Sequence, residues 1–91
     1  MTLELKNEPT LKDFQDYVLK MKKERGFNTT DKFYECCLLA EECGSVPGNV
    51  AEELADVFIY ICSLANMHGI DLEQAFRKKE EKNKQRVWKR L

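Results

Sequence analysis

Apolar residues recur at intervals of three and four along most of the chain, and this spacing predicts helices. The first predicted helix opens at Thr10, which precedes Asp13 by three residues as in a capping box, and it ends at Gly26. Its apolar positions are Leu11, Phe14, Tyr17, Val18 and Met21. The basic residues between them are expected on a solvated face or, alternatively, within reach of a phosphate. They are Lys12, Lys20, Lys22, Lys23 and Arg25.

A turn at residues 44–48, rich in Gly, Ser and Pro, separates two further predicted helices. Thr29 or Thr30 is expected to cap the first of them, which runs toward Glu42. Its apolar residues are Phe33, Tyr34, Cys37, Leu38 and Leu39. Asn49 is expected to cap the second helix, and Glu52 at the third position completes a predicted capping box.

The helix after Asn49 has the strongest apolar pattern in the chain and is expected to supply most of the core. Its stripe consists of Val50, Leu54, Val57, Phe58, Ile61, Leu64 and Ala65. This helix is predicted to end near His68 and Gly69. Because the turn before it is short, it should lie antiparallel to the preceding helix.

A fourth helix is predicted to open at Asp71, with Gln74 three residues later as in a capping box. Its early apolar residues are Leu72, Ala75 and Phe76. The apolar pattern then nearly vanishes until Val87, Trp88 and Leu91, so this basic segment either projects into solvent or lines a charged site. The prediction is an all-α, four-helix bundle-like domain over residues 10–91, preceded by an N-terminal arm at residues 1–9.

Ninety-one residues bury only a modest core, so association between copies is expected. A net charge of −1 argues against a general nucleic-acid binder, and no apolar run is long enough to cross a membrane. The four cysteines show no CxxC pair, which argues against zinc. They are expected to be buried thiols in a reducing cytosol, where the protein is predicted to reside.

Charge is divided unevenly along the chain. Between Tyr34 and Asp56 there are six acids and no base, whereas residues 77–91 carry eight bases and two acids. The antiparallel arrangement should bring Glu41 and Glu42 opposite Glu53 and Asp56, and carboxylates this close repel unless they hold a cation. An all-oxygen set selects Mg²⁺ or Mn²⁺, which commonly shares the phosphates of a substrate. The alternative is an acid-rich solvated surface around a loop.

Three segments in a fixed order carry a family resemblance: AEECG, EELADVFIYICSLANMHGIDLEQAF and KKEEKNKQRVWK, with RGF before them. This set resembles the MazG-type branch of the all-α nucleoside triphosphate pyrophosphohydrolases, marked by EExxE followed by ExxD. The resemblance implies a helical homodimer or homotetramer with Mg²⁺ on the acids. It also implies hydrolysis of a (d)NTP to the monophosphate and pyrophosphate.

Matched position by position, the resemblance implies that Glu42, Glu53 and Asp56 are metal ligands. Glu41 and Glu42 take catalytic roles, with Glu41 a candidate for orienting the attacking water. The implied substrate-binding residues are Tyr60, Lys79, Lys82 and Asn83. The last acid of EExxE falls on Ser45, so one expected carboxylate is replaced by a hydroxyl. Glu35 shares a face with Glu42 but lies two helical turns, about 10 Å, away from it.

The sequence leaves four functions open. The first is a Mg²⁺-dependent nucleoside triphosphate pyrophosphohydrolase that cleans nucleotide pools. The second is a degenerate relative that binds nucleotide or protein without turnover, to which Ser45 points. The third is a purely structural helical oligomer, and the fourth is a pyrophosphohydrolase of a phosphoribosyl nucleotide in histidine synthesis.

Overall fold

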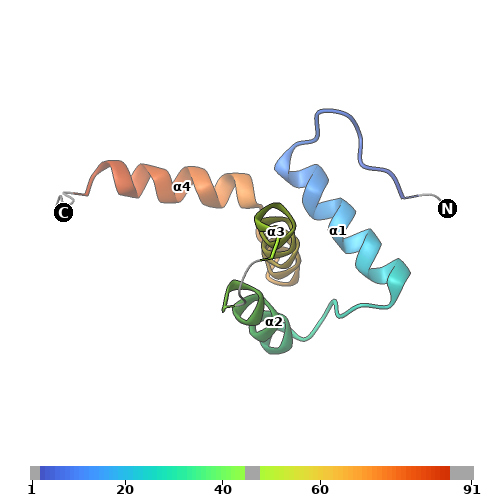
Figure 1. Cartoon of the computed structure of the whole chain (residues 1–91). Helices are drawn as coiled ribbons and strands as arrows, with labels where there is room; N and C mark the ends of the chain where they lie inside the picture. The colour runs from blue at the N-terminus through green and yellow to red at the C-terminus, as the bar shows by residue number, and fades with distance from the viewer. Residues whose placement is uncertain (1–2, 45–47, 87–91) are drawn as a thin grey trace.

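The described part of the chain contains four helices (Figure 1). The structure is a computed structural model that describes residues 3–44 and 48–86. The helices are α1 (Leu11–Arg25), α2 (Lys32–Gly44), α3 (Val50–Met67) and α4 (Leu72–Lys84), and the described residues contain no strand. The predicted all-α fold is therefore confirmed.

The helix ends follow from local hydrogen bonding. Thr10 and Asp13 form the complete capping box predicted for α1, and Gly26 ends that helix in the left-handed conformation with φ 72°. Asn49 and Asp71 cap α3 and α4 through the backbone N–H groups of the third helical residues. Since the Glu52 side chain makes no bond back to Asn49 in the described structure, only half of the box predicted there forms.

The cap of α2 differs from the prediction. Asp31, not Thr29 or Thr30, accepts the backbone N–H of Tyr34 through its side chain at 3.0 Å. The Asn28 side chain in turn accepts the backbone N–H groups of Thr30 and Asp31. An Asx turn therefore precedes the cap and shifts the start of the helix beyond both threonines.

The core lies where α3 contacts α1 on one side and α2 on the other (Figure 1). Its buried hydrophobic residues are Val18, Met21, Cys62 and Ala65. At its edge the rings of Phe14 and Phe58 meet edge-on, with centroids 5.3 Å apart. In Figure 1, α4 runs away from the other three helices, and residues 73–82 are exposed.

Polar residues take part in this small core. Lys22 on α1 is 5% exposed, so the prediction that it lies on a solvated face was wrong. Its Nζ donates to the fully buried carboxylate of Glu35 on α2, and to Ser63 Oγ on α3 at 2.8 Å. The three helices are thus joined by one buried polar cluster.

Much of the apolar stripe predicted to be core is exposed in the single chain. Val50 and Leu54 are 61% and 64% exposed, and Ile61 is 38% exposed. Phe33 on α2 and Phe76 on α4 are exposed at 80% and 69%. The stripe on α3 is wider than the surface that α1 and α2 cover, so this side of the fold has no covering helix within the described part of one chain.

The cysteines also depart in part from expectation. Cys62 is buried, and desolvation raises the pKa of its thiol to about 11, as for an inert core residue. Cys36, Cys37 and Cys43 on α2 are exposed, so the prediction of four buried thiols was wrong. None of the described helices is long and apolar enough to span a membrane.

Candidate functional site

Glu42, at the end of α2, lies against Glu53 and Asp56 in the first turns of α3. The Glu42 carboxyl lies close to the carboxyl groups of Glu53 and Asp56. This contact confirms the antiparallel arrangement predicted from the short turn. Because residues three apart share one side of a helix, Glu53 and Asp56 point to the same place.

Crowding of these carboxyl groups changes the acidity of Glu42. The hydrogen bond to Glu53 raises the pKa of Glu42 to about 7, with further contributions from desolvation and from the charges of Glu53 and Asp56. Such a shift is typical of carboxylates that share one site, where like charges disfavour full ionisation. Near neutral pH and without metal, Glu42 is therefore partly protonated.

The donor atoms of these three residues are of the kind that a hard divalent cation binds. No three carboxylate, thiol or imidazole groups of residues 3–44 and 48–86 stand in a ready-made metal cage. The carboxyl groups of Glu42, Glu53 and Asp56 nevertheless lie close enough together for Glu53 and Asp56 to raise the pKa of Glu42. Their donors are all oxygen, the set that Mg²⁺ and Mn²⁺ prefer.

The other acids of this region differ in their surroundings. Glu41 is exposed on α2 beside the cluster. Glu35 is fully buried and paired with Lys22, so it cannot supply the carboxylate that Ser45 lacks. Ser45 itself lies outside the described residues.

A pocket of about 570 Å³ opens next to the acids, between α1, the α1–α2 loop, α2 and α3. Asp56 and Tyr60 both line this pocket. Burial raises the pKa of Tyr60, and the neighbouring carboxylate of Glu42 raises it further. The phenol therefore keeps its proton and can donate a hydrogen bond to a ligand.

The sequence did not predict most of the lining of this pocket. Arg25 at the end of α1, Phe27 and Asn28 in the loop, and Tyr34 on α2 all contribute to it. The RGF segment is part of the family resemblance, which assigns it no role. Its position in the pocket depends on how α1 crosses α3, which the sequence pattern does not give.

The three predicted contacts on α4 lie elsewhere. Lys79 and Lys82 are exposed and Asn83 is half-buried, on the helix that runs away from the acids (Figure 1). Met67, the last residue of α3, lies eleven residues after Asp56, which places the start of α4 about 16 Å along the helix from the acids. Within one chain, the structure does not bring the basic residues of α4 to the carboxylates.

Comparison with known families gives an independent result. The profile of the MazG nucleotide pyrophosphohydrolase domain matches residues 33–90, which include α2, α3, α4 and every acid of the cluster. Neither the curated proteins nor the solved structures contain a significant match. The match covers well over half of the sequence, and the chain belongs to the MazG nucleotide pyrophosphohydrolase family.

Proposed function

We propose that the protein is a Mg²⁺-dependent nucleoside triphosphate pyrophosphohydrolase, which converts a (d)NTP and water to a (d)NMP and pyrophosphate. The observation that supports this most is the convergence of Glu42, Glu53 and Asp56 beside a pocket large enough for a nucleoside. Membership of the MazG nucleotide pyrophosphohydrolase family supports the same function. We expect the protein to act on nucleotide pools in the cytoplasm.

In this proposal, Glu42, Glu53 and Asp56 would hold Mg²⁺. The bound ion would supply charge neutralisation for the triphosphate and a more acidic water. Water would attack the α-phosphorus, the bond from this phosphorus to the bridging oxygen would break, and the electron pair would leave with pyrophosphate. Glu41 is the candidate for orienting the water and accepting its proton, since it is exposed on α2 beside the ligands.

The pocket would receive the nucleoside. Phe27, Tyr34 and Tyr60 supply aromatic surface on which a base can stack. Because Asp56 lines the pocket while Glu42 and Glu53 lie beyond it, the phosphates would lie at the Asp56 end. Tyr60, one turn after Asp56 on α3, would contact the sugar or base between them.

The basic residues Lys79 and Lys82 would act on the acid site of a second copy, not on their own. Their helix leaves the body of the chain, and the exposed apolar residues Val50, Leu54 and Phe76 provide a surface for association. In a homodimer or homotetramer, α4 of one subunit could reach the acids of another. The lysines would then stabilise charge on the leaving pyrophosphate, with Asn83 nearby.

Product analysis tests the proposed activity. Incubation with each (d)NTP and Mg²⁺ should give monophosphate and pyrophosphate, and Asp56→Asn should abolish turnover. Release of orthophosphate would contradict the cleavage site. A panel that includes a phosphoribosyl nucleotide separates this activity from that of the pyrophosphohydrolase of histidine synthesis.

The second candidate is a nucleotide-binding relative without turnover, and the hydroxyl at Ser45 in place of an acid favours it. This candidate predicts that the parent binds a non-hydrolysable nucleotide with Mg²⁺ but does not cleave nucleotides. Ser45→Glu should then create activity that the parent lacks. Nucleotide hydrolysis by the parent protein would rule out this second candidate.

A further inference from the structure

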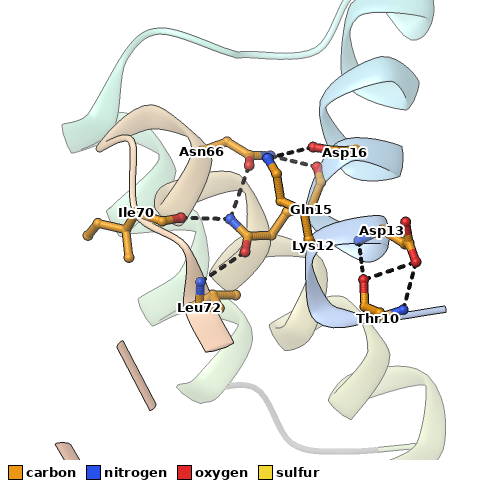
Figure 2. Close-up of polar contacts among 8 residues, drawn as sticks. All are labelled: Thr10, Lys12, Asp13, Gln15, Asp16, Asn66, Ile70 and Leu72. Atoms are coloured by element: carbon orange, nitrogen blue, oxygen red, sulfur yellow. Dashed lines mark hydrogen bonds and ion pairs between the residues drawn. The ribbon is translucent and has the colours of Figure 1, made fainter. Parts of the chain in front are cut away.

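Gln15, in the second turn of α1, is 1% exposed although its side chain is a polar amide (Figure 2). Its Nε2 donates to Ile70 O at 2.8 Å and to Asn66 Oδ1 at 3.3 Å. Its Oε1 accepts the backbone N–H of Leu72 at 3.0 Å. The side-chain amide of Gln15 therefore makes hydrogen bonds to the last turn of α3, to the turn after it and to the first residue of α4.

Asn66, on α3, completes this cluster. Its Nδ2 donates to the backbone oxygen of Gln15 at 2.8 Å, so the two residues bond each other in both directions (Figure 2). We call the hydrogen bonds of Gln15 with Asn66, Ile70 and Leu72 the amide clamp. It connects α1, the last turn of α3 and the first residue of α4.

The amide clamp matters for α4 because that helix has few other contacts. Leu72 is its first residue and is half-buried, whereas the residues from Glu73 to Lys82 are exposed. Lys82 lies ten residues beyond Leu72, or about 15 Å along the helix. A change of about 20° in the direction of α4 at its base would therefore displace Lys82 by about 5 Å, far beyond hydrogen-bonding tolerance.

We propose that Gln15 is a positioning residue, which fixes the direction of α4 and so delivers Lys79 and Lys82 to the acid site of a second subunit. This inference rests on the proposed function. It assigns a role to α1, which lies outside residues 33–90 matched by the family profile. Gln15 itself touches neither the acids nor the pocket beside Asp56.

Subunit mixing tests this role. Gln15→Met keeps the length of the side chain and removes all three of its hydrogen bonds. It should lower kcat/KM by about 10- to 100-fold. Co-expressed with Asp56→Asn, it should regain activity, because its acids can use the intact α4 of the other subunit. Co-expressed with the Lys79→Ala/Lys82→Ala double variant, it should stay inactive, because every α4 is then defective.

Recovery in the second mixture would overturn the proposal, since it would show that Gln15 serves the acid site of its own chain. Full activity of Gln15→Met alone would overturn it as well. Lys12→Ala is the matched control on the same helix, because it removes only the exposed ion pair with Asp16.

Leu72→Pro is a second variant that tests the same hydrogen bond in case Gln15→Met does not fold. Proline is tolerated at the first helical position, and the extended conformation of Asp71 suits a following proline. This variant removes the N–H that Gln15 accepts, so it should behave as Gln15→Met in both mixtures.

If the wild-type protein itself hydrolyses no nucleotide, the proposed function fails. The clamp is then tested by amide exchange, in which Gln15→Met should speed exchange selectively in α4, and unchanged α4 exchange would overturn it.

Discussion

Lys22 on α1 and Glu35 on α2 form an ion pair that is almost completely buried, with side-chain exposures of 7% and 0%. Ser63 and Asn28 also bond to this pair, and both charged residues line the pocket. Buried ion pairs add little net stability, but removal of one partner leaves a charge without compensation. The pair therefore holds α1 against α2 at the wall of the pocket.

Lys22→Met should lower the free energy of unfolding by about 3–5 kcal/mol, because it leaves the Glu35 carboxylate buried and unpaired. The double variant Lys22→Met/Glu35→Leu should recover most of this loss. Urea unfolding followed by circular dichroism measures both. Lys12→Ala, which removes an exposed pair, should cost less than about 1 kcal/mol. A double variant as unstable as the single would contradict this account.

Without metal, the stability of the fold should decrease as pH rises from the pKa of Glu42 in the unfolded chain to its higher pKa in the folded protein. Its pKa is raised from 4.5 to about 7 in the folded protein, chiefly by the hydrogen bond to Glu53. In that range the folded state binds more protons than the unfolded state, so unfolding becomes easier as pH increases. Melting temperatures in a chelator across this range and about one pH unit beyond it on the alkaline side measure this slope.

Two comparisons make the pH experiment specific. Glu42→Gln should lose the part of the slope that lies between the unfolded and folded pKa values of Glu42, since the amide does not titrate. Saturating Mg²⁺ should also remove it, because metal and proton compete for the same oxygens. A slope that persists unchanged in Glu42→Gln would show that another group is responsible.

Leu54→Asn should shift the protein from an oligomer to a monomer with little loss of helical content. Leu54 is 64% exposed in the single chain, so its replacement should change the stability of a monomer by no more than about 0.5 kcal/mol. Sedimentation velocity and circular dichroism measure the two effects. Glu24→Ala, at an exposed site on α1, is the control. An unchanged sedimentation coefficient would exclude the α3 stripe from the interface.

Asp56→Asn and the Lys79→Ala/Lys82→Ala double variant should each be inactive alone and active when co-expressed. In the mixed oligomer, the double variant supplies intact acids and Asp56→Asn supplies an intact α4. Activity near one quarter of the wild-type value is expected if equal amounts of the two subunits combine at random. Absence of recovery in demonstrated mixed oligomers would mean that each site is built from one chain.

The starts of α1, α3 and α4 and the approach of Glu42 to Glu53 could be predicted because they depend on short-range chemistry. Thr10, Asn49 and Asp71 each cap a helix through a backbone group three residues away, and this relation is visible in the sequence. Glu42 meets Glu53 because a short turn leaves the two helices no other arrangement. For these features, the capping residues and turn length seen in the sequence predict the same arrangement that the helix packing shows.

Polar residues of the core could not be predicted in this way. Gln15 and Lys22 follow Leu11 and Val18 by four residues, so they share the apolar face of α1, but their polar residue types predict exposure to solvent. Their partners lie far away in the sequence, on α2 and near the end of α3. The same limit applies to Arg25 and Phe27, since only the crossing of α1 over α3 places them at the pocket. The exposed stripe with Val50 and Leu54 follows the core pattern correctly, but the described part of a single chain offers no helix to bury it.

Hydrolysis in water labelled with oxygen-18 tests the central claim most directly, because it reports which phosphorus the water attacks. With Mg²⁺ and the preferred triphosphate, mass spectrometry should find the label in the nucleoside monophosphate and none in pyrophosphate. Label in pyrophosphate or in orthophosphate would place the attack on another phosphorus and contradict the proposed function.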